Sequence, residues 1–512
     1  MKTSFCVVML SLMCQAVTPV SDAFSTKKVA VRAPAVAGQF YPSDATRLAN
    51  TIDCFLADAI PPAKERPIAI ICPHAGYVYS GQIAADAYNQ ADGHDYDLIV
   101  ILGTNHTTAG FGGVSIYPGG GYRTPLGIAN IDEELATELI DADRTFTFKK
   151  SVHEREHSIE VQVPFVQLLF PEAQILAAVI GTPDPDLCIR FGETLANKIK
   201  DRKALIVASS DLSHYPAWED ANTADQATLG ELSKLDVDAF QSITQKQLRG
   251  GPPNLVTCAC GAAPVMTAIA AAKKLGATSA QIISYANSGD TAFGKRDRVV
   301  GYGAVAFVDG APLNNLTPAE EAARTGAVDI ELSDQHKKAL LTFARKSIRQ
   351  FLTAETPPLA RGFDPVLEQE HGAFVTLKKG GELRGCIGHM AGDLPLCQTV
   401  GYCALQAAFN DRRFSPVQPD ELHEIEIEVS VLTPYRLVDS YLEIQIGRDG
   451  VMIEKDGRSA VFLPYVPVEQ GWDREEMLEH LCRKAGLARD GWKEGATFYT
   501  FQAIAFDESH SH

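Results

Sequence analysis

Four short apolar runs, each ending in a turn that carries polar residues, constrain the fold more than any other feature of this sequence. Each run is too short for a typical helix, and longer segments with helical periodicity separate the runs. Parallel strands need such long connections, so the runs are predicted to be parallel strands that share one sheet. They cover residues 68–72, 98–102, 204–208 and 282–285.

Polar side chains with catalytic potential follow three of these runs. His74 comes after the first run, His106 after the second, and Asp211 and His214 after the third. In an open α/β sheet, ligands bind outside the carboxyl ends of the strands. These four side chains are therefore expected to meet at one edge of the sheet and to mark a functional site.

His74, His106 and Cys260 form the sharpest candidate metal site. Two imidazoles and a thiolate can hold Fe(II), copper or zinc and leave positions open for a substrate or dioxygen. Cys260 directly precedes a predicted helix over residues 264–275, and the helix dipole would favour its thiolate. Each residue taken alone also has a simpler interpretation as a hydrogen-bonding loop residue. The shared position at strand and helix ends favours the metal site.

His214 and Asp211 are predicted to move and orient a proton beside that metal. A histidine titrates near neutral pH, and an adjacent carboxylate can fix its tautomer. The alternative for Asp211 is a helix cap. His157 stands four residues after His153, which is a metal-ligand spacing on a helix, but the charged residues 154–156 between them indicate a solvated face. His157 is therefore predicted to support the ligands rather than to bind the metal.

Cys386, in the motif LRGCIG, is a candidate reactive thiol. Arg384 lies two residues before it, and a neighbouring cation can lower a thiol pKa. His389 is the one nearby residue in the sequence that could serve as a base. The alternative is a closely packed structural turn.

The chain divides into two globular parts. At 512 residues it is too long for one ordinary domain. Apolar periodicity lapses over residues 311–334, which are predicted to be a linker containing at most a short helix at 318–324. An α/β domain with a mostly parallel sheet is predicted for residues 30–310. An α+β domain on a largely antiparallel sheet is predicted for residues 335–508, with a hairpin turn at Gly380–Gly381.

The first residues resemble a targeting segment. Lys2 precedes an apolar run over residues 5–13, and Ser21 and Ala23 are small residues at positions that a signal peptidase reads. Residues 1–23 are predicted to be a cleaved signal peptide, which makes the protein periplasmic or extracellular, or cytoplasmic if it is not cleaved. The alternatives are a wrongly chosen start codon and a merely apolar tail. The run is too short to span a bilayer, so no membrane span is expected after cleavage.

Charge and cysteine content narrow the choice of partners. The 46 basic and 64 acidic side chains give a net charge of −18, which disfavours nucleic acid and anionic membranes as main partners. A small molecule or a peptide is the expected ligand. Nine of the eleven cysteines would remain after cleavage, so at least one thiol stays unpaired or metal-bound unless it pairs between chains.

Residues 30–308 resemble the Memo family. The motifs RAPAVAGQFYP, CPHAGYVYSG, LGTNH, TPLG, EHSIEVQVPF, SSDLSHY and CACG occur in that family's order. Its fold is similar to class III extradiol dioxygenases of the LigB type. The resemblance implies a metal at His74, His106 and Cys260 and an acid/base role for His214. The dioxygenases have a carboxylate where this chain has Cys260, and a thiolate favours softer ions and copper or redox roles over ring cleavage.

Residues 335–508 resemble the AMMECR domain, through LRGCIG, AAFNDRRFSP, VSVLTP, VFLPYV and KAGL. The two parts together are similar to proteins B and A of the AmmeMemoRadiSam system, fused in one chain. That resemblance implies a radical-SAM protein as partner. This chain has no Cys-x3-Cys-x2-Cys run and is not that enzyme itself.

Two functions from different classes follow. The first is an iron- or copper-dependent oxidoreductase that acts on a small molecule. The second is a non-catalytic metal-binding or peptide-binding adaptor. A zinc hydrolase fits less well, because the sequence has no HExxH motif and no carboxylate-rich ligand set.

Overall fold

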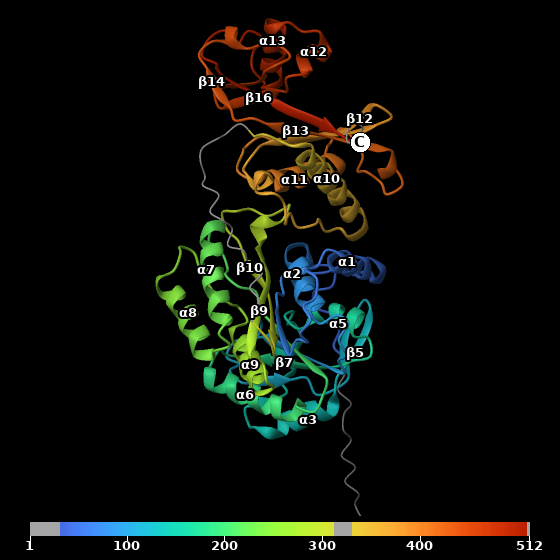
Figure 1. Cartoon of the computed structure of the whole chain (residues 1–512), viewed down its shortest axis with the longest axis vertical. Coiled ribbons are helices and arrows are strands. Elements are labelled where there is room, and N and C mark those ends of the chain that lie inside the picture. The colour runs from blue at the N-terminus through green and yellow to red at the C-terminus, as the bar shows by residue number, and fades with distance from the viewer. Residues whose placement is uncertain (1–30, 312–329, 509–512) are drawn as a thin grey trace, which may run out of the picture.

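The computed structural model describes residues 31–311 and 330–508, and these residues form two domains (Figure 1). The predicted signal peptide and the predicted short helix at 318–324 lie outside the described residues, as does most of the predicted linker. In the part of the chain that the structure describes, no helix combines the length and the apolar character needed to cross a membrane.

The N-terminal domain is built on an eight-stranded mixed sheet with the order β6-β3-β7-β2-β8-β1-β10-β9. Strand β1 pairs in parallel with β8, β8 with β2, and β2 with β7. Strand β10 runs antiparallel to both β1 and β9, so β9 points the same way as β1. The four apolar runs of the sequence thus all point toward one edge. The strands are β1 (Ala69–Cys72), β2 (Leu98–Thr104), β3 (Val114–Ile116), β6 (Phe146–Thr147), β7 (Gln174–Ile180), β8 (Ala204–Ser209), β9 (Ser279–Asn287) and β10 (Gly301–Val308).

Helices cover both faces of this sheet, because β1 and β2 are buried along their whole length. Helix α2 packs on β1, β9 and β10, and α9 packs on β2 and β8, while α1 packs against α2 and α6 against α9. The helices are α1 (Ala45–Ala57), α2 (Tyr77–Asn89), α3 (Glu133–Ala142), α4 (Lys150–His153), α5 (Val163–Leu169), α6 (Pro185–Ile199), α7 (Trp218–Leu232), α8 (Val237–Gly250) and α9 (Ala262–Lys274).

The C-terminal domain contains two four-stranded sheets, with the orders β12-β11-β13-β18 and β14-β17-β15-β16. The first packs against α10 and α11, and the second against α13. Strand β13 alternates as predicted, with Ile425, Ile427, Val429 and Val431 buried. The elements are α10 (Asp334–Ala354), β11 (Ala373–Lys379), β12 (Glu382–His389), α11 (Leu396–Phe409), β13 (Ile425–Leu432), β14 (Arg436–Val438), β15 (Gly450–Lys455), β16 (Arg458–Phe462), α12 (Val466–Gln470), α13 (Arg474–Lys484), β17 (Thr497–Phe501) and β18 (Ala503–Asp507).

The sequence pattern also makes four local predictions that the structure contradicts. It predicts a helix near residues 82–89, but α2 begins at Tyr77, because Gly81 does not break it. A side chain at Gly81 would collide with Phe55 of α1, so this glycine serves close helix packing. The segment 111–132, predicted as a loop, contains β3 and the hairpin β4 (Gly121–Thr124) and β5 (Gly127–Asn130).

The other two lie near the C-terminus. The last predicted strand, 497–506, is two strands, because Gln502 lies where the chain passes from the sheet of β15 to that of β13. Residues 444–446 form no strand, because a capped 3-10 turn at Tyr441–Glu443 precedes them.

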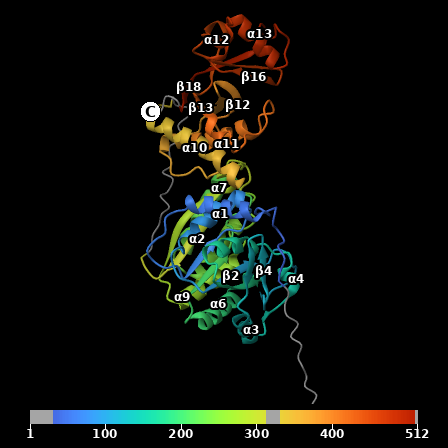
Figure 2. The same ribbon diagram turned by 90° about the vertical axis from the view of Figure 1, so that its right-hand side faces the viewer.

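The two domains meet where α10 packs on α1, as both ribbon views show (Figures 1 and 2). Arg361 of the C-terminal domain pairs with the fully buried carboxylate of Asp86 on α2, at 2.5 and 3.0 Å. That carboxylate also accepts hydrogen bonds from the Ser284 hydroxyl (2.6 Å) and the Ile60 amide (2.9 Å). Lys346 pairs with Asp58 at 2.6 Å beside this site. Buried polar pairing therefore fixes how the domains sit on one another.

Arg361→Ala is expected to lower the free energy of unfolding by about 2–4 kcal/mol, because the buried Asp86 carboxylate would lose its cation. The matched control is Arg47→Ala. Its partner Glu355 also lies across the interface, but both side chains are about half exposed, and such pairs contribute less than about 1 kcal/mol. Urea unfolding followed by circular dichroism measures both. Equal losses in the two variants would contradict the special role of the buried pair.

Candidate metal centre

His74 lies in the loop after β1, is almost fully buried, and has one ring nitrogen fixed by Ser209. Its Nδ1 lies 3.0 Å from the Ser209 hydroxyl. That hydroxyl donates its single hydrogen to the Ser158 carbonyl at 2.6 Å, so it accepts from Nδ1–H. The Nε2 of His74 therefore carries a free lone pair, and it points at the Cys260 sulfur 3.1 Å away. A ligand histidine is commonly oriented in this way by a partner on its other nitrogen.

Cys260 directly precedes α9, and the short loop before the helix places its sulfur against the loop after β8. The Asp211 amide donates to Sγ at 3.3 Å, and the Cys260 amide donates to the Asp211 carbonyl at 3.2 Å. Gly261 allows this approach, since a side chain there would come within 2.2 Å of the Ser209 carbonyl oxygen. The thiol of Cys258 points elsewhere, to the Thr244 carbonyl.

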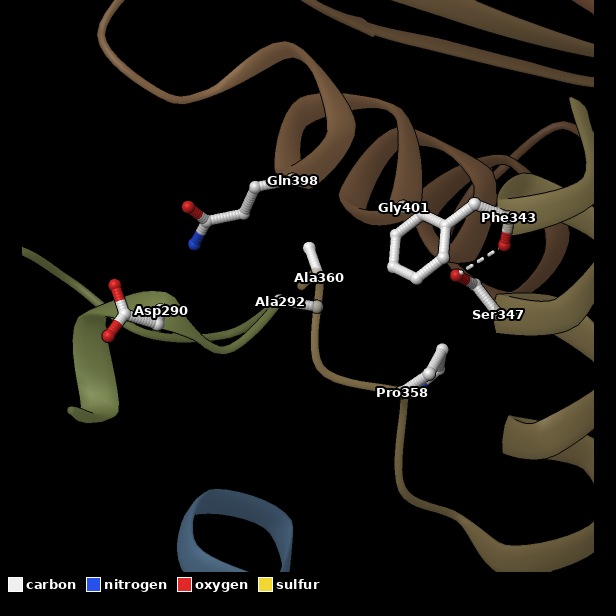
Figure 3. A pocket seen from close by; sticks show the side chains of 8 residues that line it. All are labelled: Asp290, Ala292, Phe343, Ser347, Pro358, Ala360, Gln398 and Gly401. Atoms are coloured by element: carbon white, nitrogen blue, oxygen red, sulfur yellow. Dashed lines mark hydrogen bonds between the residues drawn. The ribbon is translucent and has the colours of Figure 1, made fainter. Parts of the chain in front are cut away.

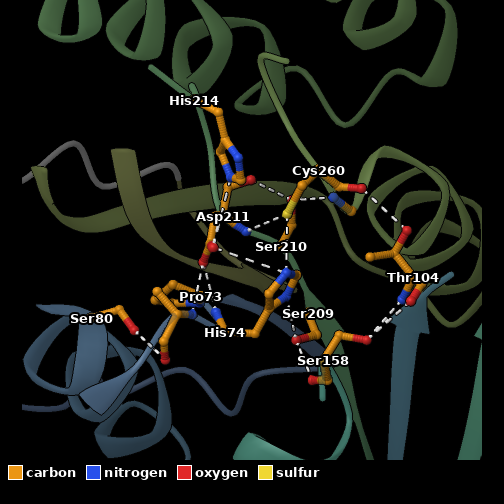
Figure 4. A network of polar contacts seen from close by, with 12 residues as sticks. Pro73, His74, Ser80, Thr104, Ser158, Ser209, Ser210, Asp211, His214 and Cys260 are labelled. Atoms are coloured by element: carbon orange, nitrogen blue, oxygen red, sulfur yellow. Dashed lines mark hydrogen bonds and ion pairs between the residues drawn. The ribbon is translucent and has the colours of Figure 1, made fainter. Parts of the chain in front are cut away.

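Asp211 ties the loops after β1 and β8 together (Figure 4). Its Oδ1 accepts from the backbone amides of His74 (2.7 Å) and Ala75 (3.2 Å). Its Oδ2 lies 4.0 Å from the Nε2 of His74 and 3.9 Å from the Nε2 of His214. Asp211 caps no helix, so its role lies in this site. The Nε2 of His214 is buried without a hydrogen-bond partner among the described residues, and this leaves it free for a ligand or a proton.

The candidate ligand atoms fall into two groups that share His74. One group contains His74, His106 and His157, and the other contains His74, Asp211 and Cys260; within each, the ligand atoms lie within 4.8 Å of one another. The rings of His106 and His157 stack with their centroids 4.9 Å apart. Each group keeps part of the predicted trio, because His106 lies with His74 and His157 while Cys260 lies with His74 and Asp211. No group among the described residues contains both His106 and Cys260, and His157, predicted to support the ligands, lies at ligand distance itself.

His157 and His153 do not share a helix, because α4 ends at His153. His153 is buried and bonds to Ser115 (3.0 Å) and Tyr122 (2.9 Å), away from the centre. The prediction of a solvated face between them was wrong at Glu156, which is buried near the guanidinium of Arg32. Arg32 also pairs with the buried Glu160 at 2.6 Å. This buried network holds the segment that carries His157.

Burial disfavours charge on the side chains of the metal-free centre. It lowers the pKa of His74 far below the usual range, and the neighbouring imidazoles lower it further. Burial likewise lowers the pKa of His106 and His214, and that of His157 to about 3. Burial raises the pKa of the Cys260 thiol and of the Asp211 carboxyl. Neutral imidazoles offer lone pairs at pH 7, and a divalent cation would balance the charge of a thiolate formed at Cys260. The donor set therefore fits a metal ion.

Cys386 lies in the C-terminal domain, apart from this centre. Its sulfur accepts from the Thr376 hydroxyl at 3.3 Å, and burial raises the pKa of its thiol. Arg384, predicted to lower that pKa, instead binds Glu421 at 2.6 Å. His389 lies three residues along β12, so the strand's alternation places its side chain on the other face from Cys386. Neither residue predicted to activate the thiol is therefore placed to do so.

Sequence reasoning missed the residues that orient the ligands, namely Ser158, Gln162 and Ser209. Gln162 donates to the Pro73 carbonyl and to the Ser209 hydroxyl, both at 2.9 Å. Two of these residues belong to EHSIEVQVPF, a motif in which only the histidine had drawn a functional interpretation. Polar residues that lead into an apolar run were the available signal.

Comparisons with known proteins agree with this architecture. Residues 32–306 match the family model of Memo-like proteins, and residues 341–506 match AMMECR1. Proteins named as MEMO1 family members are similar to the first part over 54% of this chain: 33% identical in Nitrosopumilus maritimus, covering all of that protein, and 36% identical in Aquifex aeolicus, covering 99% of it.

Among solved structures, an uncharacterized protein of Pyrococcus horikoshii is 37% identical over 35% of this chain and 93% of its own, with a TM-score of 0.34. An uncharacterized protein of Escherichia coli K12 is 13% identical over 41% of this chain and 86% of its own, with a TM-score of 0.30. With its family match over more than half its length, the chain belongs to the Memo family, and it carries an AMMECR1 domain in the same polypeptide.

Proposed function

We propose that this protein is a metal-dependent oxidoreductase that acts on a small molecule at the His74–His106–Cys260 centre. The observation that carries the proposal is the 3.1 Å distance between the Nε2 of His74 and the Cys260 sulfur. Two further polar side chains, which we do not count as ligands, lie beside this pair. Those groups are Asp211 and His214. A bare structural metal site would need no such pair.

His74, His106 and Cys260 would hold the ion. An iron or copper ion bound there would supply redox chemistry. A thiolate ligand favours these metals over harder ions, which prefer oxygen ligands. Zinc is the less favoured occupant, because Zn²⁺ has no redox chemistry and an oxidoreductase needs a redox-active metal. The neutral Nε2 of His214 can accept a proton from a substrate hydroxyl, and the Asp211 carboxylate 3.9 Å away stabilises the imidazolium that results. His74 is almost fully buried, whereas His106 is exposed and would leave the ion open to solvent and substrate on that side.

The presence of both domains in one chain supports a second proposal, that the protein works with a separate radical-SAM protein. The non-catalytic adaptor function is the competing proposal. It predicts a bound metal with no turnover.

His74→Ala is expected to abolish metal binding, because both groups of candidate ligands share His74. His106→Ala and Cys260→Ala should each lower the metal content to well below half, and His157→Ala should retain it. The measurement is metal per chain by elemental analysis after anaerobic purification, with folding checked by circular dichroism. Cys258→Ala is the matched control, because its thiol lies two residues from Cys260 and points to the Thr244 carbonyl. Loss of metal in His157→Ala together with retention in Cys260→Ala would show a three-histidine site instead.

His214→Ala is expected to slow turnover by about 10²–10⁴-fold while the metal stays bound, which is the usual size of general acid–base catalysis. His214→Gln keeps a hydrogen bond but does not titrate, so it should be nearly as slow. Oxygen uptake with catechol-like substrates gives the rate, and elemental analysis gives the metal content. Loss of the metal would make His214 a ligand, and an unchanged rate would refute its acid/base role.

A further inference from the structure

The segment that carries His214 is paired along its length with the chain that leads into β10. Amide-to-carbonyl hydrogen bonds of 2.7–2.9 Å alternate between the two segments. They join Leu212 to Gly301, Gly301 to Ser213, Tyr215 to Val299, Val299 to Pro216 and Trp218 to Arg296. On its other side, His214 exchanges backbone hydrogen bonds of 3.0 Å with Val256 and Thr257. The position of the His214 ring thus depends on where residues 296–301 lie.

The backbone beside His214 is held in an unfavourable conformation by this pairing. Tyr215 has φ of 77°, in the left-handed region that side chains other than glycine rarely adopt. Its amide bond to Val299 is 2.7 Å, and the guanidinium of Arg298 lies 3.9 Å from the centre of its ring. Such a residue persists only when its surroundings over-determine it. Loosening residues 296–301 would therefore let Tyr215 relax and move His214.

The C-terminal domain donates hydrogen bonds to the start of the loop that leads into β10, residues 288–300. Gln398, in the first turn of α11, is 6% exposed, and its Nε2 donates to the carbonyls of Gly289 (2.8 Å) and Thr291 (3.1 Å). Its Oε1 accepts from Arg296 at 3.4 Å, so both ends of the amide meet partners of the right polarity. Arg296 also lies 3.6 Å from Glu370 of the C-terminal domain. Figure 3 shows Gln398 directed toward the segment of Asp290 at this junction.

Loop 288–300 is held by further polar contacts between its Gln398 end and the residues that pair with the His214 segment. Trp218, which begins α7, donates from Nε1 to Asp290 at 2.5 Å, and Arg296 lies 4.4 Å over its ring. Asp290 in turn closes a capping box with Asn287 at the end of β9. The Ser288 amide donates to the Val300 carbonyl at 2.9 Å. A displacement at Gly289 or Thr291 is therefore passed on to Val299 and Val300 through short polar contacts.

We propose that Gln398 is a positioning residue for the metal centre, through which the AMMECR1 domain holds loop 288–300 and thereby the ring of His214. Leucine at this position would leave the Gly289 carbonyl without the amide donor of Gln398, and the Thr291 carbonyl with the Gly294 amide alone. A buried carbonyl that loses its donor favours local opening. The AMMECR1 domain thus acts on the Memo domain without contributing a ligand or a reacting group. The functional consequence rests on the role proposed for His214, but the placement of the ring can be tested without any turnover.

The test compares the full-length chain with Gln398→Leu by amide hydrogen exchange and mass spectrometry. Peptides covering residues 288–300 and 211–216 are expected to exchange roughly tenfold faster in the variant, the size expected for losing about one net hydrogen bond. In the same samples, diethyl pyrocarbonate should modify His214 faster, while the exposed His423 serves as internal reference. A general loss of stability would accelerate exchange in buried peptides throughout the chain and not only in these two.

Lys346→Met is the matched control, since it breaks an interdomain pair with Asp58 that does not touch the loop. It should leave the 211–216 peptide and His214 unchanged. If Gln398→Leu also loosens α10 and α11, Gln398→Asn is the deciding variant. It keeps the polar amide, but its shorter side chain brings that amide less close to the two carbonyls. Faster exchange confined to 288–300, no change in either peptide, or the same change in Lys346→Met would each overturn the proposal.

Discussion

The Asp211 carboxylate is the contact on which the metal centre depends. Its Oδ1 joins two backbone amides of the loop after β1, while its own backbone bonds to Cys260. Three chain segments that are distant in sequence thereby meet within hydrogen-bond distance. Burial raises the pKa of this carboxyl, while the donated amide hydrogen bonds favour its ionised form. The Asp211 side chain thus holds the loop after β1, while its backbone holds Cys260.

The sheet could be predicted because its evidence is local. A run of four or five apolar residues that ends in a polar turn indicates a buried strand within a single window of sequence, and each of the four predicted runs overlaps a strand. The ligand candidates followed, since strand direction places His74, His106, Asp211 and His214 at one edge. The reversed direction of β10 was not visible, because a buried antiparallel strand has the same apolar pattern.

The features that sequence could not give depend on distant partners. Glu156 was interpreted as solvated because charged residues usually are, and its cation, Arg32, stands 124 residues earlier. His157 was accordingly placed behind the ligands, although that buried network turns it toward His74. The tautomer of His74 depends on Ser158 and Ser209, which no spacing rule connects. In the same way, Gly81 resembles a helix breaker until Phe55 is seen to fill the space above it.

The AMMECR1 domain contributes none of the candidate ligands, because each of them comes from the first 260 residues. The relatives from Nitrosopumilus maritimus and Aquifex aeolicus match 54% of this chain over nearly all of their own length. The second domain contacts loop 288–300, where the Gln398 amide donates to the carbonyls of Gly289 and Thr291. An influence exerted there would reach the segment 211–216, which carries both His214 and Asp211, because this segment pairs with residues 296–301.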